Sequence, residues 1–514
     1  MVVLDSESDN SSRRPANGPS GSSPAQIFEQ FRAALPEGEL NRMVQCAIRL
    51  ESALNRVASL EEGIVMIAYG GGKDSTYALA FVRGMQLILD RIYGKTFRLR
   101  VATGRHAGMP VAVMENIDRA YEALLLLDDP SCELLLIDGE EVSPYRADVP
   151  LPDGVVERGR TNILMTGHRC SGDGRPTFCN SCNLNMVRAI FAGACHGQNA
   201  TLIVTGDSPT EQRAYYRWVS RLARRLAITP ESPTRHSFSR FMEMFDGVAR
   251  EYDQSIHGGD TPGGVKELAP SQPDEQISYF SIYEETSYES GAHWDFLTKF
   301  LGFVFDDVAF SFSESDCGNP GLMAHLRGLK AEHRYGTSYE AGLEEYVRFA
   351  LGLMRTKNFP DHLIETIRQR YKDEDGVRRM RKAMNEYAWQ AHRLTEEQLI
   401  CLVFSPFVDQ GAVLKEYIAT AQPGLSDRAD DIHALLAGET GSDGDDLREA
   451  LERMSGLSLR HLRILYQAGS LDRGRRLEEP SLLEAILDDD PHKKVIKTMI
   501  GAEGPMVDEM ISGR

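Results

Sequence analysis

The sequence predicts an α/β protein, in which a doubly wound parallel sheet is followed by a helical carboxyl-terminal domain. Between residues 61 and 320, short apolar runs of strand length alternate with stretches of helical period. Strands that are linked through helices favour a parallel sheet with both faces covered. From residue 321 onwards the apolar residues recur at helical spacing nearly to the last residue, which predicts a second, helical unit.

The chain has 514 residues, enough for two or three domains. Its predicted parts are a disordered tail at 1–24, amino-terminal helices at 25–60, the α/β domain at 61–320 and the helical domain at 321–514. The tail is assigned because Ser, Asn, Gly and Pro stand there in place of an apolar period. Gly- and Pro-rich residues 254–276 predict a mobile loop or linker within the α/β domain.

Four apolar runs are predicted as the main strands of the sheet. They are Gly63–Tyr69, Phe97–Ala102, Cys132–Ile137 and Thr201–Val204, with helices between and after them at about 75–89, 113–127, 183–195 and 210–226. Residues 277–282 and 303–312 are further candidate strands, which would extend the sheet or form a small appendage. Ligands of such sheets bind beyond the carboxyl ends of the strands.

The composition is that of an ordinary globular protein, with 42% hydrophobic and 26% charged residues. No apolar run is long enough to span a bilayer and the first residues lack the apolar core of a signal peptide, so we expect a cytoplasmic protein without a membrane partner. The formal net charge of −19 argues against a general nucleic-acid binder, because such proteins present basic surfaces to phosphates. The charge therefore favours a small-molecule substrate.

A glycine-rich turn directly after the first strand is the most informative motif. Residues 70–76 read GGGKDST and lead into a helix. The glycines allow backbone N–H groups to face an anion, and the helix presents unpaired N–H groups and the positive end of its dipole. Lys73 adds a positive charge, and Ser75 and Thr76 add hydroxyl groups. Asp74 can cap the helix or bind Mg²⁺ through oxygen. The pattern predicts a phosphate-binding loop, although its spacing is neither that of a Walker loop nor GxGxxG.

This loop resembles the SGGxDS loop of the PP-loop ATP pyrophosphatases, whose fold is of the HUP type, with Gly70 in place of the first serine. The resemblance covers about residues 60–230. It implies that Lys73, Asp74 and Ser75 are catalytic and that ATP is bound with Mg²⁺. The ATP-binding residues that it implies are Ala68, Tyr69, Gly70, Gly71, Gly72, Lys73, Asp74, Ser75 and Thr76 at the loop, Ala102, Thr103 and His106 at the adenine, and Gly206 and Asp207 of the TGDS turn at the α-phosphate.

Enzymes of this family cleave ATP between the α- and β-phosphates and adenylate a carbonyl or amide oxygen. A sulfur or nitrogen nucleophile then displaces AMP, so the resemblance implies a transferase or ligase that forms AMP and diphosphate. The nearest members are the tRNA-thiolating enzymes and the N-acetyl sugar amidotransferase-like proteins, whose tail the stretch from Cys317 to Gly336 weakly resembles. A sulfur carrier or a glutaminase would be the partner that supplies the nucleophile.

The cysteines predict a metal site. Four of the 8 cysteines gather between residues 170 and 195, where Cys179-Asn-Ser-Cys182 places two thiolates about one turn apart, within reach of one metal ion. The resemblance implies an iron–sulfur cluster with Cys317 as third ligand. Local spacing alone offers a Zn²⁺ site within 168–182 instead, formed by His168, Cys170, Cys179 and Cys182. The same spacing also suits a redox-active CxxC pair, or cysteines that bind no ligand at all.

Arginines recur at helical spacing after the TGDS turn, at positions 213, 217, 221 and 224. Arg213 and Arg217 are candidate substrate ligands because they lie nearest the start of the helix, and a solvated helix face is the alternative. The basic run at 378–382 follows acidic residues, which predicts a surface helix with local ion pairs. Tyr215, Tyr216 and Trp218 are predicted to pack in the core.

Two other functions stay open. A tRNA 2-thiolation-type enzyme would present a basic groove at the arginines and hold RNA with its helical domain. A non-catalytic, nucleotide-binding or metal-stabilised scaffold would bind ATP without releasing pyrophosphate. No Ser-His-Asp, HExxH or paired-carboxylate pattern points to a hydrolase.

Overall fold

The computed structural model describes residues 24–35, 38–179, 182–230, 238–259, 277–286, 293–305, 319–356, 359–439, 444–471, 482–488, 493–499 and 506–512. Within these residues no helix combines the length and the apolar character that crossing a membrane requires.

A six-stranded sheet in the order β4-β3-β2-β1-β5-β6 forms the centre of the α/β region. Its strands are β1 (Ile64–Ala68), β2 (Arg98–Arg105), β3 (Cys132–Asp138), β4 (Glu141–Pro144), β5 (Leu202–Thr205) and β6 (Ser278–Ser281). All neighbours run parallel except β4, which pairs antiparallel with β3 at the edge. The chain winds outwards from β1 to β3 and then returns to the other side of β1. A doubly wound sheet has its switch point there, between β1 and β5.

The four main strands and the strand near residue 280 are confirmed, whereas β4 was not predicted. β4 has only four residues and ends at Pro144, so its sequence carries no strand period. The expected strand at 303–312 is wrong for Phe303, Val304 and Phe305, which have no strand conformation, and residues 306–312 lie outside the described residues.

Alternate side chains of β1 enter two different hydrophobic layers, as the pleat of a strand requires. Val65 and Ile67 pack into a core with the helices on one face of the sheet. These are α1 (Pro24–Ala34), α2 (Glu39–Leu54), α3 (Lys73–Tyr93), α4 (Val111–Ala123) and the short η1 (Phe296–Phe300). Ile64 and Met66 face α7 (Cys182–Ala194) and the start of α9 (Phe238–His257) on the opposite face.

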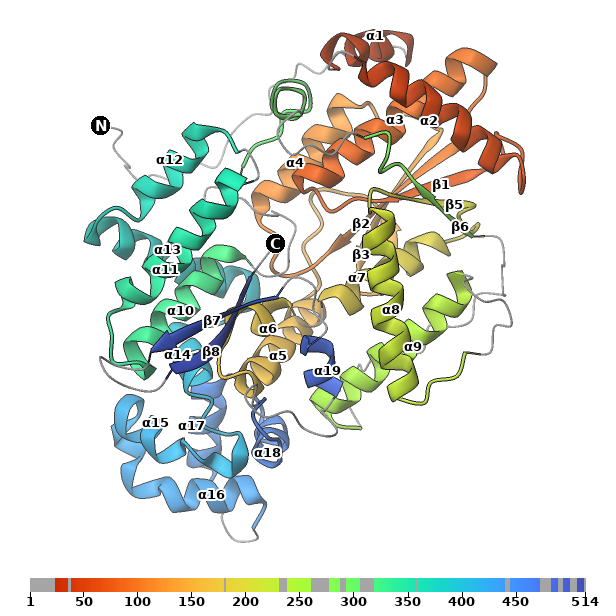
Figure 1. Cartoon of the computed structure of the whole chain (residues 1–514). Coiled ribbons are helices and arrows are strands. Elements are labelled where there is room, and N and C mark those ends of the chain that lie inside the picture. Colours follow the sequence, from red (N-terminus) through yellow and green to blue (C-terminus); the bar gives the residue numbers. More distant parts are fainter. Residues whose placement is uncertain are drawn as a thin grey trace.

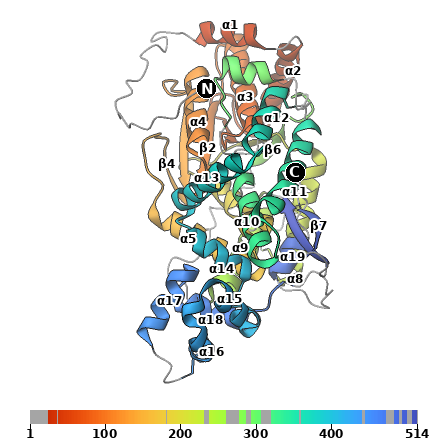
Figure 2. The same cartoon turned by 90° about the vertical axis from the view of Figure 1, so that its left-hand side faces the viewer.

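Most of the carboxyl-terminal region is helical, and its helices α15 to α18 lie at the opposite end of the molecule from α1 and α2 (Figures 1 and 2). Its helices are α10 (Pro320–Arg334), α11 (Tyr339–Thr356), α12 (Asp361–Arg370), α13 (Glu374–His392), α14 (Glu396–Phe404), α15 (Leu414–Ala421), α16 (Ala429–Ala437), α17 (Asp445–Ser455), α18 (Leu459–Gln467) and α19 (Leu482–Asp488). They share one large core with α5 (Asp153–Arg169), α6 (Gly174–Cys179), α8 (Pro209–Arg225) and α9.

The expectation of a helical pattern nearly to the end of the chain is wrong for the last described segments. They form an antiparallel hairpin of β7 (Lys493–Met499) and β8 (Met506–Ser512). In Figure 1 this hairpin lies beside α10 and α6, and Arg327 of α10 pairs with Glu509 of β8. Its long-range packing partners, and not its own period, decide its conformation.

Candidate functional site

The predicted phosphate loop lies at the carboxyl end of β1, beside the switch point of the sheet. Gly71 has a φ of 72°, a left-handed conformation that glycine adopts without strain. A Cβ atom at Gly71 would lie 2.7 Å from Val113 Cγ1 and 2.8 Å from Ile117 Cγ1 of α4. The loop therefore turns against α4 so closely that both its backbone angle and its packing require glycine at this position.

Helix α3 begins with an N-terminus that no side chain caps. Its N-cap residue is Gly72, and the helix runs for 21 residues from Lys73. The hydroxyl groups of Ser75 and Thr76 both donate to the Gly72 carbonyl, at 2.9 and 2.8 Å, so they tie down the loop instead of facing outward as donors. The unpaired first-turn N–H groups and the helix dipole are suited to an anion at this end of α3.

The charged residues of the loop are already paired with each other. Lys73 is 7% exposed and its Nζ forms an ion pair with the carboxylate of Asp74, which is largely exposed. The same ammonium lies 5.8 Å from the ring centroid of Trp294. Tyr69 and Thr76 are buried and their hydroxyl groups form a hydrogen bond with each other at 3.1 Å, so they stabilise the loop on its buried side.

The TGDS turn follows β5, on the other side of the switch point. Thr205 Oγ1 donates to Asp207 Oδ2 at 2.7 Å and accepts from the Asp207 N–H at 3.1 Å. Ser208 then caps α8 in a capping box with Glu211. Apart from its chain neighbours, none of the described residues has an atom within 4 Å of where a Cβ would stand at Gly206. The N-terminus of α8 is thus closed by side chains, whereas that of α3 is open.

The predicted adenine residues differ in exposure. Thr103 is buried, and its hydroxyl pairs with that of Tyr121 at 2.9 Å. Ala102 is buried against α7. His106 is half-buried in the loop after β2, and its charge would oppose that of His392 at the end of α13. Among these residues, only His106 keeps a partly accessible side chain for a ligand.

Helix α7 places the CxxC motif at the same edge of the sheet as the phosphate loop. The helix runs antiparallel to β2, since a Cβ at Gly104 would lie 3.4 Å from that of Ala189 and one at Gly193 would lie 3.0 Å from that of Ala102. With a rise of about 1.5 Å per residue, the start of α7 lies roughly 10 Å further along than Ala189, beyond the carboxyl end of β2. Cys182 begins α7, and Cys179 ends α6 immediately before it.

The predicted metal ligands are only partly described. Cys170 and Cys179 are buried, whereas Cys317 and the side chain of Cys182 lie outside the described residues. His168 is fully buried, and its ring meets that of Phe407 edge-on with centroids 5.5 Å apart. Within the described residues, no three His, Cys, Asp or Glu side chains lie close enough to share a metal.

Three buried side chains on or near α6 have polar atoms without a hydrogen-bond partner among the described residues. They belong to His168, Thr177 and His392. Burial lowers the pKa of His168 and of His392 to about 3, so both rings are neutral. Buried polar groups are usually paired, and exceptions often lie at ligand sites. His392, whose ring lies 6.2 Å from that of Phe178, was not predicted, because nothing near it in sequence marks a site.

The two basic stretches behave differently. Arg213, Arg217 and Arg224 are exposed on α8, whose only acidic residue, Glu211, is used in the capping box. Among the described residues, no carboxylate forms an ion pair with any of the three. The run at 378–382 is paired as predicted, with Arg378 on Asp375, Arg381 on Glu396 and Glu332, and Lys382 on Glu386.

The predicted aromatic packing after the TGDS turn is confirmed for two residues. Trp218 is 7% exposed and meets Phe245 edge-on, with ring centroids 6.4 Å apart. Tyr216 stacks on Phe241 at 6.3 Å. Tyr215 and Tyr216 are partly buried against the same core.

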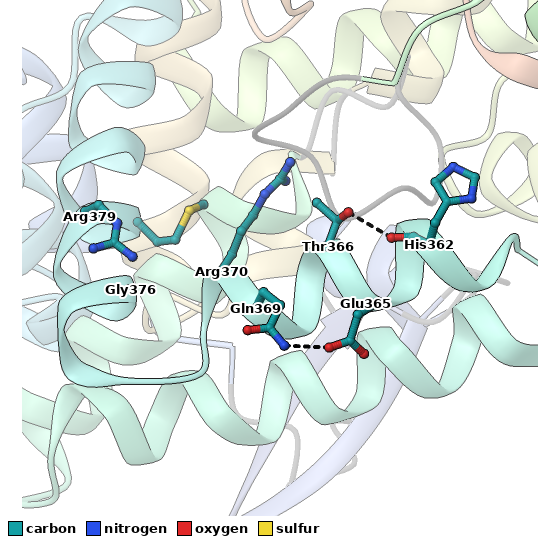
Figure 3. A pocket seen from close by; sticks show the side chains of 8 residues that line it. His362, Glu365, Thr366, Gln369, Arg370, Gly376 and Arg379 are labelled. Atoms are coloured by element: carbon teal, nitrogen blue, oxygen red, sulfur yellow. Dashed lines mark hydrogen bonds between the residues drawn. The ribbon is translucent and has the colours of Figure 1, made fainter. Parts of the chain in front are cut away.

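A hollow of about 540 Å³ lies between α12 and the start of α13. Figure 3 shows Arg370 and Arg379 at its wall, with Gln369 bonded to Glu365 and Thr366 bonded to the backbone of His362. Its lining is His362, Glu365, Thr366, Gln369, Arg370, Gly376, Arg379 and Met380. None of the predicted site residues lies in it.

Comparison of the chain with protein-family models, with curated proteins and with solved structures finds no match.

Proposed function

We propose that this protein is an ATP-dependent enzyme that adenylates an acceptor and then transfers sulfur or nitrogen to it. The observation that carries the proposal is the open N-terminus of α3 behind a glycine turn, at the switch point of a doubly wound sheet. This is where such sheets bind nucleotides, and the backbone N–H groups there suit a triphosphate. The resemblance of the GGGKDST loop to the PP-loop supplies the reaction.

In the proposed reaction, an acceptor oxygen attacks the α-phosphorus of ATP and the bond to the β-phosphate breaks, so pyrophosphate leaves. The first turn of α3 holds the leaving pyrophosphate. Lys73 would exchange its bond to Asp74 for a phosphate oxygen, and the freed carboxylate could then hold Mg²⁺, which would neutralise phosphate charge. A sulfur or nitrogen nucleophile then attacks the activated carbon, whose bond to the AMP oxygen breaks.

The position of Cys179 and Cys182 beyond the carboxyl edge of the sheet favours sulfur over nitrogen. Thiolates at this edge lie at the same end of the strands as the phosphate loop, so an acceptor that spans this end of the sheet could reach both. A metal ion or cluster bound there would hold the sulfur that is transferred. The unpaired polar atoms of His168 and His392 fit a site for a bound group near α6.

The experiment follows radiolabelled ATP through a reaction with a small-molecule extract as the source of acceptor. We expect AMP and pyrophosphate to form, and α,β-methylene ATP to inhibit because its α–β bridge resists cleavage. Asp74→Asn and Ser75→Ala should lose this activity, whereas Asp90→Asn, an exposed change at the far end of the same helix, should keep it. Release of ADP and phosphate instead would contradict the reaction, and ATP binding without any cleavage would favour a scaffold.

A small molecule is the preferred acceptor because the chain has a formal charge of −19. RNA is the second candidate, and the exposed Arg213, Arg217 and Arg224 of α8 favour it. They begin one turn after the TGDS turn and extend away from it, so a bound strand would reach the proposed site. An RNA acceptor predicts tRNA binding that weakens steeply with salt, whereas a small-molecule acceptor predicts none.

A further inference from the structure

A buried cluster of four charged residues joins α6, α10 and the hairpin. Asp173 precedes α6, Arg327 and Lys330 belong to α10, and Glu509 belongs to β8. Each of the four is at most 7% exposed. Lys330 Nζ lies 2.7 Å from Asp173 Oδ1 and 3.5 Å from Glu509 Oε1, and Arg327 Nη2 lies 3.2 Å from Glu509 Oε2. Two cations therefore balance two carboxylates in the interior.

Glu509 has partners on β7, on α10 and at the residue after α10. Besides the two cations, it accepts hydrogen bonds from the hydroxyl of Tyr335 at 3.0 Å and from that of Thr498 on β7. Burial alone would raise the pKa of Glu509, but Lys330 and Arg327 outweigh it and keep the pKa below its ordinary value. Burial likewise opposes the charge on Lys330, and the two carboxylates reverse this and raise its pKa. Glu509 and Lys330 thus stabilise each other's charged forms.

Asp173 connects this cluster to the cysteine segment. Its backbone carbonyl accepts a hydrogen bond from the Thr177 N–H at 3.1 Å, and this bond closes the first turn of α6. Its side chain reaches the other way, because Oδ2 accepts the Met510 N–H of β8 at 2.8 Å. A Cβ at the next residue, Gly174, would lie 3.0 Å from Met323 of α10, so α6 begins pressed against α10 as well. Helix α6 then ends at Cys179, only six residues after Asp173.

We propose that the β7–β8 hairpin is a positioning element of the cysteine site, and that Glu509 acts through Lys330 and Asp173 to hold Cys179 in place. The role of Cys179 in this inference rests on the proposed function, whereas the contacts of Glu509, Lys330 and Asp173 do not depend on it. A six-residue helix has little stability of its own, so its direction depends on what anchors its first turn. Here that anchor is a residue more than three hundred positions away in the chain.

The experiment measures how fast each cysteine of the full-length chain reacts with a maleimide, resolved by peptide mass spectrometry. Glu509→Gln removes the charge and keeps the shape of the side chain. We expect it to speed labelling of Cys179 at least tenfold, while labelling of Cys46, buried in the separate core beside the sheet, stays slow. Asp508→Asn is the matched control, since Asp508 is the exposed neighbour on the same strand and should change neither rate.

A purely structural role would increase the labelling of Cys46 and Cys179 together, and unchanged labelling of Cys179 in a folded Glu509→Gln protein would also overturn the proposal. If that variant does not fold, Tyr335→Phe removes a single hydrogen bond to Glu509 and should give a smaller, still selective increase at Cys179. Glu509→Asp, which keeps the charge, should restore part of the protection. None of these readouts uses ATP, so loss of pyrophosphate release in the earlier assay leaves them interpretable.

Discussion

Replacing Gly71 with alanine tests whether the phosphate loop has the conformation described above. Two costs add at this position. A left-handed backbone costs an alanine about 1–2 kcal/mol, and the φ of Gly71 is 72°. The new Cβ would also lie less than 3 Å from Val113 and Ile117, an overpacking that costs about 1–3 kcal/mol. The sum is roughly 2–5 kcal/mol.

Gly94→Ala separates the two costs. Gly94 has a φ of 66° at the other end of α3, and a Cβ there would meet no atom of the described residues within 4 Å beyond its chain neighbours. The free energy of unfolding of this control should fall by only about 1–2 kcal/mol, which is the cost of the left-handed backbone alone. Both variants are compared with the wild type by chemical unfolding and by equilibrium dialysis of ATP.

If the Gly71→Ala loop relaxes instead of unfolding the protein, the cost appears in ATP binding. An affinity loss of about 30-fold or more is then expected, since 1.4 kcal/mol corresponds to a factor of about ten. Gly94→Ala should bind ATP like the wild type. A Gly71→Ala protein as stable as Gly94→Ala, with unchanged ATP affinity, would refute the reasoning.

Three further predictions concern buried or unpaired charges. His325 is fully buried, and burial is the main cause that lowers its pKa to about 4, so the ring is neutral in the folded protein. In the unfolded chain it takes up a proton below about pH 6.5, so the free energy of unfolding is highest above that pH and falls by about 2 kcal/mol by pH 5. His325→Gln should reduce this loss in unfolding curves measured at the two pH values. Arg100 is buried and donates to the carbonyls of Gly193 and Ala194 at the end of α7. Arg100→Met should therefore lower the free energy of chemical unfolding by about 3–5 kcal/mol, whereas Arg98→Met, at an exposed position, should change it very little. Equal effects of the two substitutions would contradict the role of the buried guanidinium. If RNA is the acceptor, replacing Arg213, Arg217 and Arg224 together with alanine should remove about three phosphate contacts. The slope of log affinity for tRNA against log salt concentration, measured by filter binding, should become correspondingly shallower. Alanine at the paired Arg378 should leave this slope unchanged.

The elements that local pattern determines could be predicted from the sequence. The GGGKDST loop was found because a glycine turn between a strand and a helix carries its own signal. The antiparallel β4 and the β7–β8 hairpin were missed because their conformation depends on partners distant in sequence. The same holds for the site: Cys179 is marked by its spacing from Cys182, whereas His392 and Glu509 reach the neighbourhood of α6 only through the packing of α13 and β8. Ser75 and Thr76 were expected to face a phosphate, and only the structure shows that their protons go to the Gly72 carbonyl.

The charge cluster at Asp173 also imposes an order of events during synthesis. Lys330 leaves the ribosome 179 residues before Glu509, the difference between 509 and 330. At about 5–20 residues per second, the interval lasts roughly 9–36 s. During that time Lys330 can pair with Asp173 but not yet with Glu509, and burying an unbalanced charge is unfavourable. The contacts of Glu509 with α10 can form only after β8 has been made, so we expect the cysteine segment to be among the last parts of the chain to reach its native place.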